Sequence, residues 1–215
     1  GGFPYLLTPE TWCNGGIPQF ANLTLLYTRV VSDVKRLIEQ SGDDPATFDG
    51  IFVNDFEYWS PSWYQSSLEY RQNSLRWVWF RDPNVSTSDA LLQAQEEFEN
   101  ATKAIMLTSI AATRAAAPNA LIGLYNLPGR QQLGDGYCDP MLAPLLRTWN
   151  DEMSWLWSEV DVLMPSLYIL YDNWPGDGGS NIAYVECILR EALRIAASLS
   201  PQPPVIPFLW YRLHP

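Results

Sequence analysis

The sequence predicts an α/β protein, most simply a barrel of parallel strands with helices between them. Short apolar runs typical of strands, at 51–53, 120–124, 160–170 and 203–210, alternate with helical segments. Such alternation is typical of parallel strands joined by helices. About four strands can be recognised, whereas a closed barrel has about eight, so we expect an incomplete barrel. The length of 215 residues and the hydrophobic content of 47% fit one domain, residues 1–215.

Helices are expected at 22–41, 64–80, 86–117, 150–157 and 182–199. In the first, third and last of these segments, apolar residues recur at three- and four-residue spacing, as on the buried face of an amphipathic helix. Gly, Pro, Asp and Asn follow the first three segments and indicate turns. Loops are expected at 1–19, which is rich in Gly, Pro and aromatic residues, and at 173–180.

The stretch 48–63, FDGIFVNDFEYWSPSW, carries the main candidate site. Its apolar residues 51–53 predict a buried strand, and the carboxylates Asp55 and Glu57 follow at once. Residues two apart in a strand point to the same side, so the two acids are expected to share one face at the carboxyl end of the strand. That end carries the chemistry in barrels of parallel strands.

Two neighbouring carboxylates repel each other, so one of them is expected to hold a proton near neutral pH. A protonated carboxyl beside an ionised one is the apparatus of acid catalysis on a glycosidic bond. The surrounding rings, Tyr58 and Trp59 among them, would raise carboxyl pKa values and stack on sugar faces. Taken alone, a D-x-E triplet is more often a solvated strand end or a loop cap.

Composition excludes several other functions. The net charge of −11 argues against nucleic acid as a partner and against long-range attraction of a polyanion at neutral pH. With His214 as the single histidine and no metal-ligand spacing among Cys13, Cys138 and Cys187, neither a metal nor another cofactor is expected. One disulfide and one free thiol are compatible with three cysteines, and the pairing stays open. No apolar run approaches the ~20 residues of a membrane span.

The sequence also bears on the cellular location. Three N-x-S/T sequons, at Asn22, Asn84 and Asn100, permit glycosylation in a secretory compartment. No signal peptide is visible at Gly1, so we expect a chain that starts after processing or a fragment. A secreted or lysosomal location is expected.

Seven pieces of the chain together resemble the hyaluronidase family, glycoside hydrolase family 56. They are NGGIPQ at 14–19, VNDFEYWSPSW at 53–63, QEEFENATKAIM at 95–106, GLYNLP at 123–128, DEMSWLW at 151–157, MPSLY at 164–168 and ILREALRIA at 188–196. Their order and spacing make the resemblance specific, and it extends from Tyr5 to Arg212.

The resemblance implies a distorted TIM-like (β/α) barrel that cleaves β-1,4 bonds of a glycosaminoglycan, hyaluronan or chondroitin, with retention. Glu57 matches the acid/base of the family, and Asp55 matches the partner that orients the N-acetyl group of the substrate. Tyr125 and Tyr168 match two tyrosines that contact this group, although without the family a buried tyrosine would be favoured. Ser166 is expected to line the cleft beside Tyr168.

The chain departs from the family in two places. The signature arginine after the tryptophan is Ser60 here, which removes a guanidinium able to fix a carboxylate through two hydrogen bonds. The family pairs a cysteine in the loop after its GLYNLP-like strand with a second one downstream. Arg130 stands at the first position and Cys138 near the second, so this disulfide is expected to be absent and the loop 129–139 more mobile.

Two other functions compete with the hydrolase. The first is a catalytically silent homologue that binds glycan or a protein partner, which Ser60 and the incomplete framework favour. The second is a chitinase-like hydrolase, but only the last two acids of the D-G-x-D-x-D-x-E pattern fit, because Gly50 and Val53 occupy the earlier acid positions. The resemblance implies that parts of the family's cleft lie outside these 215 residues, so the isolated segment is expected to be poorly active or inactive.

Overall fold

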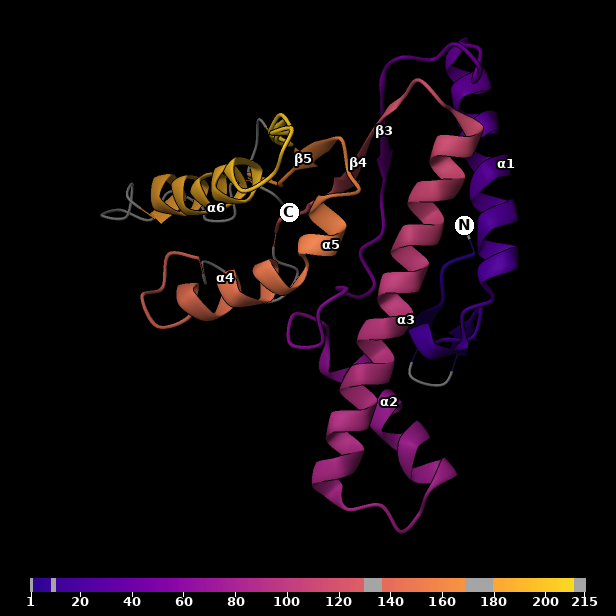
Figure 1. The fold of residues 1–215 in the computed structure, drawn as a ribbon, viewed down its shortest axis with the longest axis vertical. Coiled ribbons are helices and arrows are strands. Elements are labelled where there is room, and N and C mark those ends of the chain that lie inside the picture. Colours follow the sequence, from indigo (N-terminus) through magenta and orange to yellow (C-terminus); the bar gives the residue numbers. More distant parts are fainter. Residues whose placement is uncertain (1, 9–10, 130–136, 169–179, 211–215) are drawn as a thin grey trace. The chain divides into compact units, whose positions relative to one another are not determined.

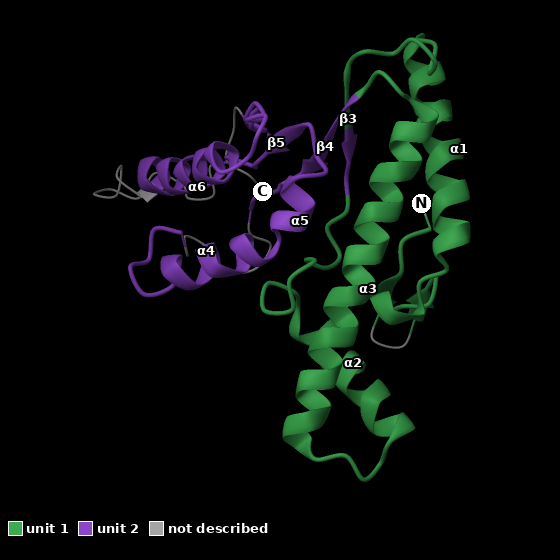
Figure 2. Ribbon diagram, in the orientation of Figure 1, with its two compact units in different colours: residues 1–52, 56–120 green, residues 53–55, 121–215 purple. Residues whose placement is uncertain are grey.

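The computed structural model describes residues 2–8, 11–129, 137–168 and 180–210. The expectations for the loop at 173–179, for Arg130 and for His214 lie outside these residues. The chain divides into two compact units, one of residues 1–52 and 56–120 and one of residues 53–55 and 121–215 (Figure 2). The first is called unit 1 and the second unit 2.

Unit 1 is mainly helical. Its helices are α1 (Leu23–Ser41), α2 (Leu68–Arg81) and α3 (Thr87–Ala116), and α3 packs against both of the others (Figure 1). The apolar stripes predicted from the sequence form the contact, since Leu26 and Val34 of α1 and Phe98, Ile105 and Ile110 of α3 are buried. These helices are stable here because each buries one apolar face against its neighbour.

Side-chain hydrogen bonds cap the amino ends of α1 and α3. The Asn22 side chain accepts a hydrogen bond from the Leu25 N–H at 3.0 Å, which satisfies one of the free amides of the first turn of α1. Gly42 ends the helix with a φ of 94°, a left-handed conformation that favours glycine. Ser86 caps α3 in the same way, because its hydroxyl oxygen accepts a hydrogen bond from the Asp89 N–H at 3.2 Å.

The structure corrects two expectations for unit 1. Residues 1–19 were expected to be a loop, but they contain the antiparallel pair β1 (Tyr5–Thr8) and β2 (Thr11–Cys13) and the short 3-10 helix η1 (Pro18–Phe20). The expected helix at 64–80 begins only at Leu68, because the chain before it forms turns around Pro61. Proline cannot donate to a helical or strand ladder, so it favours this irregular start.

Unit 2 contains the parallel strands. β4 (Leu121–Tyr125) pairs with β5 (Val162–Met164) in parallel, with Tyr125 opposite Met164. The sheet order is β3-β4-β5, where β3 is Ile51–Asn54. Beyond β5 the segment 205–208 continues the parallel pairing through bridges at Val205 and Phe208, where a strand was expected. The α/β class is therefore confirmed, while the described strands form no closed barrel.

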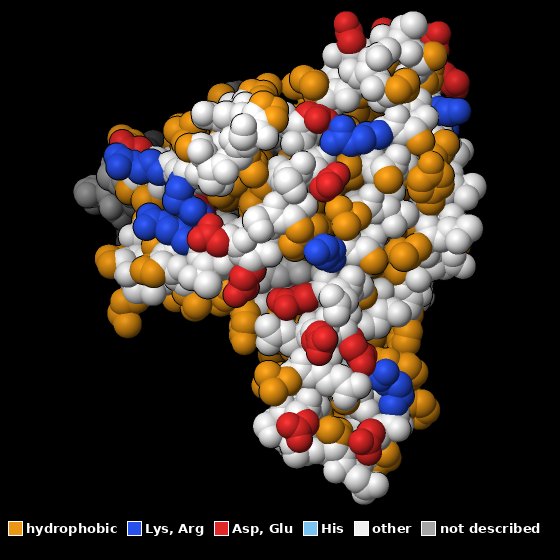
Figure 3. Space-filling model, viewed as in Figure 1, with side chains coloured by type: hydrophobic (Ala, Val, Ile, Leu, Met, Phe, Trp, Pro, Cys, Tyr) orange, Lys and Arg blue, Asp and Glu red, His pale blue; other side chains and the backbone are white. Residues whose placement is uncertain are grey.

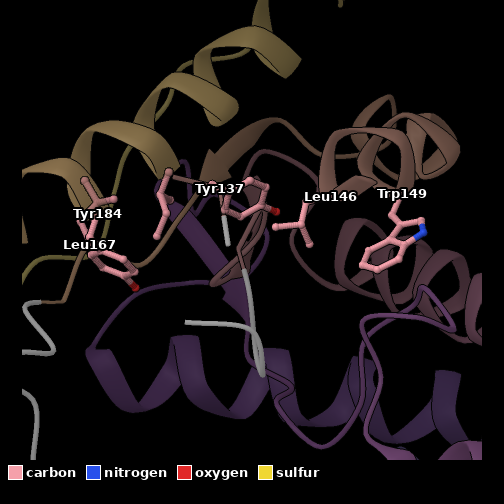
Figure 4. Packing of buried hydrophobic residues seen from close by; sticks show 6 residues of the cluster. Tyr137, Leu146, Trp149, Leu167 and Tyr184 are labelled. Carbon is pink, nitrogen blue, oxygen red and sulfur yellow. The ribbon is translucent and has the colours of Figure 1, made fainter. Parts of the chain in front are cut away.

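The helices of unit 2 are α4 (Ala143–Glu152), α5 (Ser154–Trp157) and α6 (Ser180–Ala197). The sequence predicted one brief helix at 150–157 and missed the start of α4, where Pro144 lies in the first turn. Proline is tolerated there because its missing N–H would have no helical partner. α4 and α6 share an apolar cluster, shown in Figure 4, made of Tyr137, Leu146, Trp149, Leu167, Tyr184 and Ile188.

The structure also decides the cysteine pairing that the sequence left open. Cys138 and Cys187 form a disulfide across 49 residues of sequence, and Cys13 is a free thiol. The resemblance implied that Cys138 lacks a disulfide partner near residue 130, and the structure pairs it with Cys187 on α6. Among the described helices, none has an apolar stretch long enough to cross a membrane.

Candidate active site

The two acidic residues follow β3 directly. The strand ends at Asn54, Asp55 is the next residue, Glu57 lies two further on, and both acidic residues are exposed. The boundary between the two units falls between them, with Asp55 in unit 2 and Glu57 in unit 1. That the two carboxylates share one face therefore remains a prediction.

The pKa of the Asp55 carboxyl is raised above its usual value. The cause is partial burial, which removes water from the charged form. Asp55 therefore keeps its proton to a higher pH than an ordinary aspartate does. This shift has the direction expected for a carboxyl pair that retains a proton, although its cause is desolvation and not repulsion between the two acids.

The residues on either side of Glu57 are fixed by aromatic stacking. The Phe56 ring stacks on Phe3 with 4.5 Å between the centroids, and the Tyr58 ring stacks on Tyr5 at 4.3 Å. Such ring pairs add about 0.5–1.5 kcal/mol each beyond the area that they bury. The backbone at Glu57 is thus held between two anchors while its side chain remains exposed.

Trp59 and Tyr58, both expected to contact sugar, lie in different environments. Trp59 is 1% exposed, and its indole N–H donates to the carbonyl oxygen of Pro4 at 2.8 Å. Its ring also meets Phe98 of α3 with 6.4 Å between the centroids. Tyr58 is 48% exposed, so of these two rings it is the one that offers surface to a ligand.

The turn after Trp59 is tied to α3 by polar contacts that the sequence did not predict. Glu99 accepts a hydrogen bond from the Trp63 N–H at 3.0 Å, and Thr102 donates to the Pro61 carbonyl oxygen at 2.9 Å. Ser60, at the position of the family's arginine, is 5% exposed and accepts from the Ser62 N–H at 3.4 Å. The sequence held one indication of these contacts, because the polar residues Glu99 and Thr102 lie beside the apolar stripe of the helix.

The two predicted tyrosines are brought together in unit 2. Tyr125 is the last residue of β4 and Tyr168 follows β5, and their ring centroids are 6.5 Å apart. Phe208 meets Tyr125 edge-on at 4.9 Å, and Trp210 meets Tyr168 at 5.4 Å. Because β4, β5 and the segment 205–208 are parallel, these rings gather at the carboxyl edge of the sheet.

Phe208 and Trp210 were not singled out from the sequence. The signal was there, because residues two apart in an extended segment point to the same side. Ser166 lies beside them: it is 7% exposed and pairs with Phe208 through a parallel bridge. The serine is therefore placed at the carboxyl edge but is largely covered in the described part of the chain.

The described residues contain no group of three or more His, Cys, Asp or Glu side chains that could hold a metal ion. A cavity of about 360 Å³ lies in unit 2, but Leu121, Trp157, Val160 and Asp161, which line it, are near the amino ends of β4 and β5. None of the predicted site residues lines it. In parallel α/β folds the carboxyl edge carries the chemistry, so we place the candidate site there and not in this cavity.

On the face shown in Figure 3, Asp and Glu side chains lie at several places among apolar and neutral ones. The net charge of −11 therefore acts on an anionic ligand as a general repulsion, which salt screens.

The chain is similar to known hyaluronidases in both sequence and structure. The family model described as hyaluronidase matches residues 1–214. Human hyaluronidase-1 is 31% identical over 222 residues, which covers 97% of this chain and 48% of that protein. The honeybee (Apis mellifera) hyaluronidase is 32% identical over 203 residues, which covers 93% of this chain and 51% of the bee protein. The chain thus spans about half the length of the curated relatives that it matches.

The fold agrees with the sequence comparison. The crystal structure of bee venom hyaluronidase in complex with a hyaluronic acid tetramer superimposes with a TM-score of 0.82 and 29% identity. The match covers 100% of this chain and 66% of the bee chain. A second crystal form of the bee enzyme gives a TM-score of 0.84. With its sequence matched along 214 residues and its architecture shared, the chain belongs to the hyaluronidase family.

Proposed function

We propose that this chain is the catalytic part of a retaining endo-β-N-acetylhexosaminidase that hydrolyses β-1,4 bonds of hyaluronan. The observation that carries the proposal is the meeting of Tyr125 and Tyr168, 6.5 Å apart, at the carboxyl edge of a parallel sheet. The family match along the chain supports it, and the bee relative is known in complex with a hyaluronic acid tetramer. Chondroitin, which shares the N-acetylhexosamine unit, is the second candidate polymer.

In this proposal the nucleophile belongs to the substrate. The carbonyl oxygen of the N-acetyl group attacks the anomeric carbon, while Glu57 gives its proton to the leaving glycosidic oxygen. The bond to the leaving sugar breaks and a cyclic oxazolinium ion forms. Glu57, now ionised, takes a proton from water, whose oxygen attacks the same carbon and reopens the ring. Two inversions at one carbon give retention, as in the substrate-assisted exceptions to the two-carboxylate scheme.

The other side chains hold the acetamide. Asp55 accepts the N–H of the N-acetyl group, turns its carbonyl toward the anomeric carbon and stabilises the positive charge of the cyclic ion. Tyr125 and Tyr168 contact the same group and restrict its rotation, which keeps the attacking oxygen close to its target. Ser166 lines the cleft beside them. Tyr58 offers an exposed ring to the sugar. Trp59 is buried and contributes indirectly, because its hydrogen bond to Pro4 holds the segment that carries Glu57 in place.

We propose further that both compact units belong to one catalytic domain, the TIM-like barrel of the family, and that the protein works outside the cytosol after secretion. The three sequons at Asn22, Asn84 and Asn100 fit that route, and each of these asparagines is exposed. No metal or organic cofactor enters the mechanism.

A Glu57→Gln variant tests the proposal, because glutamine keeps the shape of the side chain and cannot transfer the proton. We expect loss of hyaluronan turnover by at least about 100-fold, with binding of hyaluronan oligosaccharides retained. Glu39→Gln, at an exposed position of α1, is the matched control and is expected to match the parent protein. The products should be even-numbered oligosaccharides with a saturated N-acetylhexosamine at the reducing end, first released with retained configuration by NMR. Unsaturated ends would show a lyase and refute the hydrolase.

A catalytically silent homologue is the second candidate, favoured by the buried Ser60 at the arginine position. It predicts that the parent protein binds hyaluronan without cleaving it and that Glu57→Gln changes neither property.

A further inference from the structure

The turn that follows Tyr125 is tightly constrained. Asn126 has a φ of 58°, and the Leu127 carbonyl oxygen accepts the Met164 N–H at 3.0 Å, so the chain folds back over the end of β5. A Cβ at Gly129 would collide with the carbonyl oxygen of Asn126, which makes glycine necessary there. The direction in which Tyr125 leaves the sheet thus depends on how residues 126–129 are held.

Tyr137 holds the far end of this turn. Its side chain is buried at 5% exposure, and its hydroxyl donates a long hydrogen bond to the Gly129 carbonyl oxygen at 3.4 Å. The same hydroxyl accepts from the Asn150 amide at 3.0 Å. Asn150 is fully buried, and its amide nitrogen also donates to Glu191 at 2.8 Å. A continuous row of hydrogen bonds therefore runs from the turn through α4 to α6.

Glu191 anchors this row with a buried charge. It is 3% exposed, and Arg194 donates to both of its oxygens, each at 2.8 Å. Arg194 also pairs with Asp151 of α4 at 2.8 Å. These hydrogen bonds to Glu191 and Asp151 raise the pKa of the Arg194 guanidinium. A buried carboxylate with all its oxygens paired is rigid and costly to disturb, so it gives the row a fixed end.

The disulfide fixes the same segment a second time. Cys138 is the neighbour of Tyr137, and it is bonded to Cys187, which lies one helical turn before Glu191 on α6. Residues four apart lie on the same face of a helix, so Cys187 and Glu191 face the segment together. α6 therefore holds residues 137–138 at two points, by a covalent bond and through Asn150.

We propose that Tyr137 is a positioning residue for Tyr125. α6 fixes Tyr137 through Cys187 and Glu191, and Tyr137 fixes the turn at 126–129 that sets the place of Tyr125 at the carboxyl edge. The disulfide joins Cys138, the neighbour of Tyr137, to Cys187 on α6. This inference rests on the proposed role of Tyr125 in binding the N-acetyl group.

The test compares Tyr137→Phe with the parent protein, because the variant removes one oxygen and keeps the ring in the cluster. We expect amide hydrogen exchange in residues 121–129 to become about tenfold faster. Since a small misplacement of a group near the reacting carbon lowers the rate of the chemical step, we expect kcat on hyaluronan to fall about tenfold with KM changed less than twofold. Cys187→Ser should change both readouts in the same direction.

Leu146→Ala is the control for simple loss of stability, because Leu146 is 1% exposed in the same cluster and takes no part in the hydrogen-bond row. It should lower the melting temperature at least as much as Tyr137→Phe and leave exchange at 121–129 and kcat near the parent values. Unchanged exchange in Tyr137→Phe, or faster exchange with an unchanged kcat, would overturn the proposal. Absence of turnover in a full-length form that contains this chain would instead refute the proposed function, and the exchange measurement would still decide whether Tyr137 fixes the turn.

Discussion

The indole N–H of Trp59 donates to the carbonyl oxygen of Pro4 at 2.8 Å, across 55 residues of sequence. This bond fastens the segment that carries Glu57 to the N-terminal segment, and it is buried. Stacking of Phe56 on Phe3 and of Tyr58 on Tyr5 repeats the attachment on either side of Glu57. The candidate acid Glu57 therefore lies in a segment whose neighbouring aromatic side chains hold the backbone in place.

Replacing Trp59 by Phe should destabilise unit 1. The change leaves the buried Pro4 carbonyl without its donor and opens a small cavity, so we expect the free energy of unfolding to fall by about 2–4 kcal/mol. Urea unfolding followed by circular dichroism measures this. Trp12→Phe, at a tryptophan that is 45% exposed, should cost less than about 1 kcal/mol. Equal losses in the two variants would contradict the anchoring role of Trp59.

The raised pKa of Asp55 predicts a pH-dependent effect of Asp55→Asn. Desolvation disfavours the charged carboxylate in the folded protein. The contribution of Asp55 to the free energy of unfolding is therefore fully present below its unfolded pKa, near 3.8, and is lost as the pH rises through its folded pKa. Asparagine carries no charge at any pH. We therefore expect the stability of the variant relative to the parent protein to be greater at pH 7 than at pH 3. Urea unfolding at pH 3, 5 and 7 checks this, and a difference that is constant with pH would refute it.

The Cys138–Cys187 disulfide should make a large contribution to stability. Closing a loop of 49 residues restricts the unfolded chain, which corresponds to about 4 kcal/mol in the chain-entropy description. Cys138→Ser and Cys187→Ser should each lose that amount, and the double variant should lose no more, since all three break the same bond. Cys13→Ser, at the free thiol, is the control and should stay within about 1 kcal/mol of the parent protein.

Trp210 is expected to add to glycan binding. It is 42% exposed and meets Tyr168 edge-on, so part of its surface is open to a sugar ring. Stacking of this kind is worth about 0.5–1.5 kcal/mol, so Trp210→Ala should weaken binding of a hyaluronan oligosaccharide roughly 2- to 10-fold, as measured by calorimetry. Leu209→Ala, next in the chain and 73% exposed, should bind as the parent protein does. If both variants bind equally, Trp210 makes no such contact.

Several features could be predicted because they are encoded in consecutive residues. The apolar periodicity and Gly42 predicted a helix at 22–41, which is within one residue of α1, and the run at 51–53 predicted β3 with Asp55 directly behind it. The same local patterns predicted a strand at 120–124, and the observed strand β4 is Leu121–Tyr125, so the candidate Tyr125 is its last residue. Periodicity, caps and turn residues act within a few positions, so a single sequence contains what they need.

Other features depended on residues far apart in the chain. The sequence could not say that Cys138 pairs with Cys187, that Trp59 is bonded to Pro4, or that Phe208 and Trp210 meet the two candidate tyrosines. Each of these contacts exists only once strands and helices have packed, because packing and not local preference brings the partners within reach. The sequence by itself thus determined the long helices, the strands β3 and β4 and the candidate chemical groups. The tertiary structure alone decided which of those groups are exposed and which contacts hold them in place, because those contacts join residues far apart in the chain.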